Sequence, residues 1–178
     1  MTGDLLVESS GGLSIVAATP ALLDAEDRAP GDLAGLLGAD LPLAWPPQFN
    51  SPQTRAWMRR LLAEHPGEPG YGSWYIIGEG RLAGVCGYKG PPKAVGEVEI
   101  GYSVVEPDQR KGLATGAVRL LIARAFRDPR VKAVAAETLP SLIASQKVLE
   151  RCGFRMIDRR PHPEHGEIWR YLRSPLGG

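Results

Sequence analysis

Residues 102–115 read YSVVEPDQRKGLAT, and this stretch decides the fold. Its apolar start is typical of a strand, and the basic loop behind it opens a helix at about Gly112. Gly112 and Ala114 are small, so a ligand can approach the backbone closely. A helix start offers unpaired N–H groups, and Arg110 and Lys111 add positive charge there. The stretch predicts either a phosphate site or a turn with a solvated basic end.

Outward from this stretch, antiparallel strands precede it and helices alternate with strands after it. The expected strands are 13–17, 73–77, 82–88, 96–105, 131–137, 154–158 and 167–172, and the expected helices are 20–27, 31–37, 54–64, 112–126 and 142–152. This order indicates an α/β fold around one mixed sheet. Helix 54–64 is expected to carry an apolar and a basic face, with Trp57, Leu61 and Leu62 on the first and Arg55, Arg59 and Arg60 mostly on the second.

Three motifs follow one another in the second half of the chain. Residues 109–114, QRKGLA, resemble the Q/R-x-x-G-x-G/A segment with which the GNAT superfamily of N-acetyltransferases grips the pyrophosphate of acetyl-CoA. Residues 99–102, EIGY, look like a strand of the ribosomal-protein-alanine N-acetyltransferase group. Residues 137–154 resemble the E-T-x-P-x-N-x-A-S-x-x-V-L-E-K-x-G-F stretch of the same group. The resemblance covers roughly residues 72–173.

The resemblance implies a fold and an activity. The fold is one mixed, mostly antiparallel sheet of about seven strands, flanked by helices and splayed between strands 4 and 5. One acetyltransferase domain is expected over 1–178, with the acceptor-side part at 1–71 and the core and acetyl-CoA site at 72–178. The activity is transfer of acetyl from acetyl-CoA, a co-substrate, to a primary amine by direct attack in a ternary complex. A non-catalytic acyl-CoA-binding or sensor domain is the alternative, because Leu142 replaces the family Asn.

The resemblance also assigns cofactor-binding residues. Pantetheine is expected to insert at the splay and to pair with backbone groups of Val104. The pyrophosphate is expected on the loop and helix start, at Gln109, Arg110, Lys111, Gly112, Leu113, Ala114 and Thr115. Lys147 and Arg151 lie one helical turn apart and are candidates for the adenosine phosphate; a solvated helix face is the alternative.

Catalysis is expected beside the thioester. Glu97 and Glu99 are two residues apart on a strand, so both point to one face of the sheet. We expect Glu99 to act as general base, directly or through a water, and Glu97 to help attract a cationic amine; a structural ion pair with an arginine is the alternative for Glu99. A backbone N–H near Val104 is the oxyanion candidate. Ser145 holds the family position near the sulfur and is expected to donate to the thiolate, unless it is only an early-helix serine.

The acceptor side is less defined. Trp45, Trp74 and Tyr88 are candidates for lining the acceptor pocket, although aromatic residues more often pack in a core. The acceptor itself is open between a small molecule and a protein N-terminus. We expect no nucleic-acid or membrane partner, and a homodimer is one option.

Composition limits the other classes. Of the 178 residues, 43% are hydrophobic and 23% charged, which is typical of soluble globular proteins, and the net charge of +1 is low for a nucleic-acid protein. Residues 1–108 carry 7 basic and 14 acidic side chains, whereas residues 109–178 carry 14 and 6. Salt bridges between the halves explain this division, and so does a basic half that holds an anion.

The sequence also bears on the cellular location of the protein and on the redox state of its cysteines. No apolar run is long enough for a membrane span, and residues 1–4 show no signal-peptide start. Cys86 and Cys152 are far apart, which favours a reducing cytoplasm over a disulfide framework.

Three further patterns are interpreted as structural. Residues 78–83, GEGRLA, match a dinucleotide fingerprint, but a strand follows where a helix is required, so a hairpin turn is favoured. Cys86 lies in an apolar strand, which is typical of an inert thiol. In residues 162–165, HPEH, prolines place the imidazoles in a loop without helical spacing, so we expect no metal site.

Overall fold

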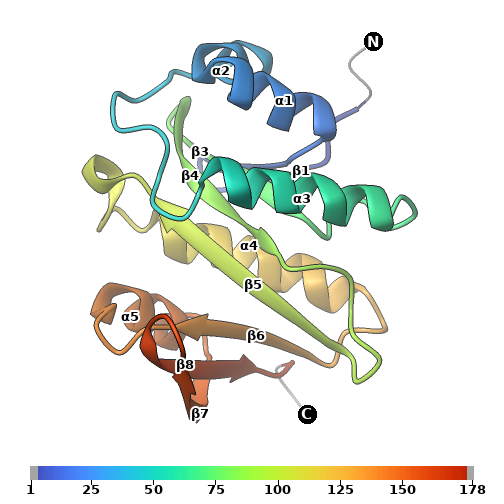
Figure 1. The fold of residues 1–178 in the computed structure, drawn as a ribbon, viewed down its shortest axis with the longest axis vertical. Helices are drawn as coiled ribbons and strands as arrows, with labels where there is room; N and C mark the ends of the chain where they lie inside the picture. Colours follow the sequence, from blue (N-terminus) through green and yellow to red (C-terminus); the bar gives the residue numbers. More distant parts are fainter. Residues whose placement is uncertain (1–3, 176–178) are drawn as a thin grey trace.

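The computed structural model describes residues 4–175 (Figure 1). Residues 1–3, to which the signal-peptide expectation belongs, lie outside the described residues. The strands are β1 (Val7–Ser10), β2 (Leu13–Ala17), β3 (Ser73–Gly78), β4 (Arg81–Tyr88), β5 (Glu97–Val104), β6 (Ala133–Thr138), β7 (Arg155–His162) and β8 (Gly166–Arg173). The helices are α1 (Pro20–Arg28), α2 (Pro30–Leu37), α3 (Pro52–Glu64), α4 (Leu113–Arg127) and α5 (Ile143–Arg151), with a short 3-10 helix, η1 (Glu106–Asp108).

The strands form one sheet in the order β1-β2-β3-β4-β5-β6-β8-β7. Neighbouring strands are antiparallel except β5 and β6, which are parallel. The mixed, mostly antiparallel sheet is therefore confirmed, with eight strands in place of about seven. None of the helices in the described part of the chain combines the length and apolar character that a bilayer crossing requires.

The additional strand is β1, a short edge strand that pairs with β2. Its sequence, VESS, contains one large apolar residue and is exposed along most of its length, so the alternation that marks a half-buried strand is absent. The turn to β2 is Gly11-Gly12, and both residues have positive φ angles, 57° and 81°. Two such glycines are a known hairpin signal, and they could have revealed this strand.

The parallel pair β5–β6 is short. Glu97–Ile100 pair with Ala133–Ala136, and the ladder ends there. β5 continues to Val104 and pairs on its other edge with β4. Residues 101–104 thus leave a gap on the β6 side, which is where the sequence predicts the splay between strands 4 and 5, counted without β1.

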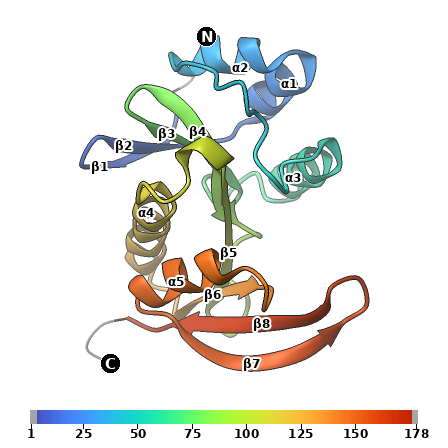
Figure 2. The same cartoon turned by 90° about the vertical axis from the view of Figure 1, so that its left-hand side faces the viewer.

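Helices cover both faces of the sheet. Figure 2 shows α4 and α5 on one side of β5 and α3 on the other, with α1 and α2 near one end. The sequence of α4 carries an apolar face, and the structure buries it against the sheet: Ala117, Val118, Leu121 and Ala125 are fully buried. A second cluster joins α1, α2 and α3 to β3 and β4.

The two faces expected for α3 are right for Leu61, Leu62 and Arg60 but wrong for Arg55 and Trp57. Arg55 is only 8% exposed, whereas Trp57 is 39% exposed. The reason is that α3 packs its arginines against acidic residues of α1: Arg55 Nε lies 2.6 Å from Asp27 Oδ1, and Arg59 Nε lies 2.7 Å from Asp24 Oδ1. Ion pairs between distant segments thus override the apolar pattern of a single helix.

Candidate functional site

The loop between β5 and α4 exposes backbone donors. Arg110 and Gly112 have positive φ angles, 64° and 79°, and Gly112 is the N-cap residue of α4 without a side-chain cap. Gly116 N–H makes the first helical bond, 2.9 Å to Gly112 O, so the N–H groups of residues 113–115 have no partner within the helix. A Cβ at Gly112 would meet no atom within 4 Å, so the space beside it is open. This geometry suits an anion such as phosphate.

Asp108 anchors the loop from inside. It is 3% exposed, accepts a 2.8 Å hydrogen bond from Lys111 Nζ and pairs with Arg81. Burial alone would raise the pKa of Asp108, but the hydrogen bonds and charges of Lys111 and Arg81 outweigh it and hold the pKa below its usual value. Lys111 is therefore tied to the loop. Arg110 is exposed, and no salt bridge joins it to a carboxylate within residues 4–175.

The gap beside β6 is lined by backbone groups of β5. The carbonyl of Glu99 and the N–H of Val105 both bond on the β4 side, at 2.8 Å each. Because successive strand residues direct their backbone groups to opposite edges, Tyr102 and Val104 direct theirs into the gap. Gln109 Nε2 donates to Val104 O at 3.0 Å, so the loop already holds one of these groups.

Glu97 and Glu99 share one face of the sheet, as the alternation requires, and the residues between and beside them point into the core. Each carboxylate has a cationic partner. Glu99 forms an ion pair with Lys89, which follows β4, and Glu97 forms one with Arg170 of β8. The acidic charge on this face is thus partly balanced, and the ion pair that was the alternative for Glu99 is formed with a lysine.

Tyr102 and Ser145 join β5 to α5. The Tyr102 hydroxyl lies 2.9 Å from Ser145 Oγ and donates to Ser145 O at 3.0 Å. Burial raises the pKa of Tyr102 to about 12, so the phenol keeps its proton at neutral pH. Ser145 is therefore held beside a neutral hydroxyl at the first turn of α5.

Leu142 occupies the N-cap position of α5. No side-chain hydrogen bond caps the helix there, as expected for an apolar residue. Instead, Gln146 Nε2 donates to the carbonyls of Leu139 and Pro140, at 3.1 and 2.9 Å. The replacement of the family Asn therefore leaves the helix start uncapped, while Gln146 fixes the preceding turn.

The two cations proposed on α5 differ in their surroundings. Arg151 belongs to an open depression of about 640 Å³ between α4 and α5, whereas Lys147 is exposed outside it. The charged residues of this depression are Arg119, Arg151, Arg155, Arg173 and Glu150. Four arginines around one glutamate make it strongly cationic, which suits a phosphate group.

The aromatic candidates lie mostly in the core. Trp74 is fully buried and donates from Nε1 to Gly70 O at 2.8 Å, and Tyr88 is 1% exposed and donates to Leu121 O at 2.6 Å. An acceptor-lining role is not compatible with this burial. Trp45 is half-buried, and its Nε1 donates to Glu26 Oε1 at 3.0 Å.

Two of the patterns interpreted as structural have different outcomes. Cys86 is buried, and burial raises the pKa of its thiol, in agreement with an inert cysteine. The loop at 162–165 departs from the expectation. The metal-binding atoms of His162, Glu164 and His165 all lie within 4.8 Å of one another, because a tight hairpin turn brings them together without helical spacing.

Three residues of the site were not singled out from the sequence: Tyr102, Asp108 and Lys89. Tyr102 and Asp108 both lie within residues 102–115, so the sequence places them near the predicted phosphate site. It does not show which residues they contact. Tyr102 and Ser145 are 43 residues apart, and no linear spacing connects them. The contact exists only because β5 and α5 are neighbours across the gap.

Known proteins resemble the chain in sequence. A family model for the acetyltransferase (GNAT) domain matches residues 30–155. A curated relative from Bacillus subtilis (strain 168), the uncharacterized N-acetyltransferase YjdG, is 29% identical over 155 residues, which is 85% of this chain and 89% of that protein.

Solved structures share the fold. RimL, a ribosomal L7/L12 alpha-N-protein acetyltransferase in complex with coenzyme A, matches with a TM-score of 0.71 at 19% identity, over 96% of this chain and 98% of that one. The ribosomal-protein-S5-alanine acetyltransferase from Vibrio fischeri matches with a TM-score of 0.69 at 16% identity, over 97% and 98% of the two chains.

Proposed function

The chain belongs to the GNAT family of acetyltransferases, and from this premise we propose that it transfers acetyl from acetyl-CoA to a primary amine by direct attack in a ternary complex. The observation that carries the proposal is the uncapped start of α4 beside the gap between β5 and β6. Backbone N–H groups that can bind a phosphate lie there next to a strand edge that no neighbouring strand pairs with. A pyrophosphate joined to an extended arm is a ligand of that shape.

Three regions of the chain each bind one part of acetyl-CoA. The N–H groups of residues 113–115 and the Arg110 guanidinium hold the pyrophosphate. Pantetheine lies along the gap and pairs with backbone groups of Tyr102 and Val104 in the manner of an added strand. The cationic depression that contains Arg151 takes the adenosine phosphate.

Glu99 is the proposed general base. It lies on the face of β5 that α4 does not cover, two residues before the gap begins at Gly101. The carboxylate forms an ion pair with Lys89, so a cationic partner already occupies the place that an amine acceptor would take. An incoming ammonium group displaces Lys89 and gives up its proton to Glu99, directly or through a water.

Collapse of the tetrahedral intermediate requires a donor for the thiolate. A backbone N–H that faces the gap near Val104 stabilises the oxyanion. Ser145 donates a hydrogen bond to the departing thiolate, which takes its proton from solvent, and Tyr102, 2.9 Å from Ser145 Oγ, holds that hydroxyl in place. The raised pKa keeps the phenol neutral, so Tyr102 remains a hydrogen-bond partner of Ser145 throughout the step.

The acceptor class is tested by a screen. RimL and the Vibrio fischeri enzyme carry names that refer to ribosomal proteins, so we propose peptides with N-terminal serine or alanine as the first acceptors. Polyamines, aminoglycosides and small metabolites complete the panel. Release of free CoA is measured with a thiol reagent. Turnover with at least one primary amine supports the proposal, and bound acetyl-CoA that no amine discharges contradicts it.

The phosphate loop is tested by Gly112→Glu. The variant places a side chain and a negative charge among the donors of the loop, at a residue with φ of 79°, so CoA binding measured by calorimetry is expected to be lost. Gly80→Glu is the matched control, because Gly80 has φ of 75°, lies in the β3–β4 turn and has equal open space. If the two variants bind CoA with equal affinity, the loop is not part of the CoA site.

A further inference from the structure

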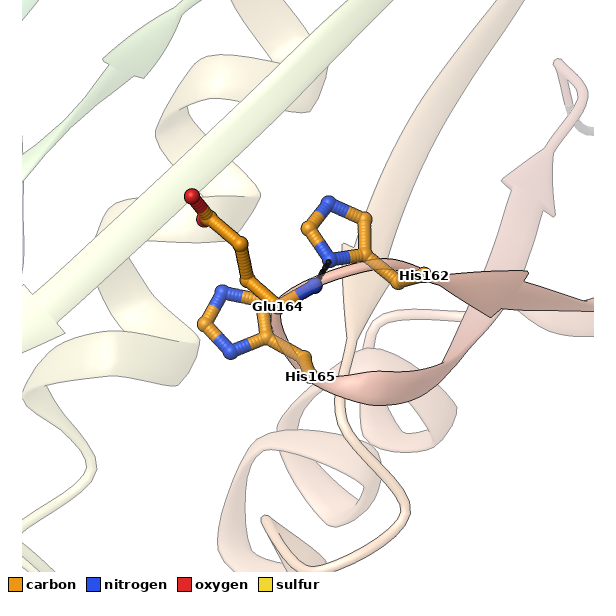
Figure 3. Close-up of side chains that lie close together, drawn as sticks. All are labelled: His162, Glu164 and His165. Carbon is orange, nitrogen blue, oxygen red and sulfur yellow. Dashed lines mark hydrogen bonds between the residues drawn. The ribbon is translucent and has the colours of Figure 1, made fainter.

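The tip of the β7–β8 hairpin carries three potential metal ligands. The segment runs from Pro161 to Gly166, and Figure 3 shows the side chains of His162, Glu164 and His165 on this one turn. One ligand atom from each residue lies within 4.8 Å of the other two. GNAT chemistry makes no use of this cluster.

The turn itself holds the ligands together. Pairing of the two strands ends at His162 and Gly166, so the three side chains come from four consecutive residues. Glu164 N–H donates to His162 Nδ1 at 3.2 Å, and the two imidazole rings stack with centroids 4.8 Å apart and an interplanar angle of 17°. Pro163 fixes one backbone angle inside the turn. Little ordering is therefore needed before an ion can bind.

The side chains are also available. Glu164 and His165 are exposed and His162 is half-buried, so a hydrated cation reaches them from solvent. No salt bridge to a basic residue engages Glu164 in the described range 4–175. The carboxylate is thus not already neutralised.

We propose that His162, Glu164 and His165 bind one divalent transition-metal ion of the Zn²⁺ class. Two imidazoles and one carboxylate are a ligand set that such ions favour, whereas Mg²⁺ and Ca²⁺ prefer oxygen ligands throughout. Three protein ligands leave at least one coordination position for water or for an external group. The site is independent of acetyl-CoA.

Binding requires two local changes. The ligand atoms, which now lie within 4.8 Å of one another, must approach to roughly 3.3 Å around a tetrahedral ion, and one nitrogen of His162 must be freed. The Nδ1 lone pair of His162 accepts from the Glu164 N–H, so the ion either replaces that donor at Nδ1 or binds at Nε2 after the ring proton has moved to Nδ1. Both changes are confined to an exposed turn. The pairing of β7 with β8 ends at His162 and Gly166, so only its last pair borders the site.

The position of the tip gives the site its context. Pairing of β6 with β8 ends at Thr138 and Trp169, so the tip extends beyond the end of β6. Figure 2 shows it on the side of the molecule where α3 lies, away from α4 and α5. A metal ion there is remote from the start of α4, where the N–H groups proposed to bind the pyrophosphate lie.

Zinc titration of the full chain tests the proposal. The protein, without an affinity tag, is stripped with a chelator, dialysed and titrated with ZnCl₂ in a calorimeter. We expect one Zn²⁺ per chain and no heat from MgCl₂. His165→Ala should weaken Zn²⁺ binding by at least about tenfold, in line with the loss of a ligand. His65→Ala is the matched control, because His65 is exposed at the end of α3, outside the cluster.

Co²⁺ absorption gives a second readout. Its visible bands should appear with the wild type and the His65→Ala variant and be lost with a His162→Ala/His165→Ala double variant. Circular dichroism checks that the variants are folded. Zn²⁺ binding that is absent, that persists in the double variant, or that falls equally in His65→Ala overturns the proposal.

Discussion

Glu99 and Lys89 form their ion pair on the uncovered face of the sheet, with side-chain exposures of 14% and 47%. A partly exposed pair of this kind contributes little to stability. Replacing the Lys89 ammonium by the ammonium of an acceptor would therefore cost little free energy. A structural ion pair and a general base are therefore compatible functions of the same residue.

The role of Glu99 is tested with Glu99→Gln. The variant keeps the shape and removes the base, so kcat should fall by about 10²–10⁴ while affinity for acetyl-CoA stays nearly unchanged. The measurement is a pH–rate profile with the best acceptor. Glu97→Gln, which loses the pair with Arg170 instead, should change kcat much less. If Glu99→Gln keeps nearly full kcat and the same acidic limb, Glu99 is only structural.

Tyr102 is tested with Tyr102→Phe, which removes one hydroxyl and leaves Ser145 without that partner. The expected loss is that of one neutral hydrogen bond, roughly a 2- to 12-fold decrease in kcat with little change in KM for acetyl-CoA. Steady-state kinetics in a Ser145→Ala background provide the control. If Tyr102 acts through Ser145, the second substitution has no further effect there; an undiminished effect would separate the two residues.

At the scale of single elements, the local sequence pattern predicts the buried face correctly where no contact with a distant segment changes it. The apolar rows of α4 and the loop before it were predictable, because helical periodicity and small residues act within a few positions. The faces of α3 were not, because Arg55 is buried by Asp27, 28 residues away. β1 was missed because an exposed polar edge strand has no alternation to detect.

The start of α5 gives an element-scale prediction. Leu142→Asn places a side-chain acceptor at an uncapped N-terminus, so thermal or urea unfolding should show a gain of about 0.5–2 kcal/mol, less any loss of apolar contact. Acetyl transfer should stay equal or rise within about tenfold.

Leu142→Ala is the control, since it removes the same apolar contacts and adds no cap. A gain in turnover of several orders of magnitude with Leu142→Asn would mean that the natural chain is essentially non-catalytic.

Across the whole molecule, the charge division of the sequence is partly neutralised by ion pairs and partly retained as a cluster of arginines. Glu8 pairs with Arg127 and Glu68 with Arg130, so part of the excess is neutralised between the halves. The arginines around the depression between α4 and α5 remain concentrated at one place. Which charged residues form ion pairs could not be predicted from the sequence, because the partners are 119 and 62 positions apart.

The N-terminal part is joined to the core by one buried carboxylate. Glu26 is 3% exposed and accepts from Trp45 Nε1 at 3.0 Å, Asn50 Nδ2 at 2.7 Å and Tyr75 OH at 2.8 Å. Arg55 lies 3.6 Å away and supplies the opposite charge. The cluster connects α1, the loop before α3, α3 itself and β3.

Glu26→Ala should therefore destabilise the whole chain. It leaves three donors without their acceptor, and unsatisfied buried groups cost about 1–3 kcal/mol each, so we expect a loss of about 3–5 kcal/mol, or a decrease in Tm of roughly 6–20 °C for a chain of this size. Arg55 keeps its ion pair with Asp27 in this variant. Asp32→Ala, which removes an exposed carboxylate paired with Arg28, should cost less than about 1 kcal/mol.

A double variant, Glu26→Ala/Arg55→Met, separates charge from packing. Because Arg55 lies 3.6 Å from Glu26 and both contact Asn50, the two residues share one cluster, and the loss of stability of the double variant in urea unfolding should be smaller than the sum of the two single losses. Strict additivity would show that Glu26 and Arg55 do not interact. The attachment of α1 to α3 would then rest on Asp24 and Asp27, which pair with the arginines of α3 at 2.7 and 2.6 Å.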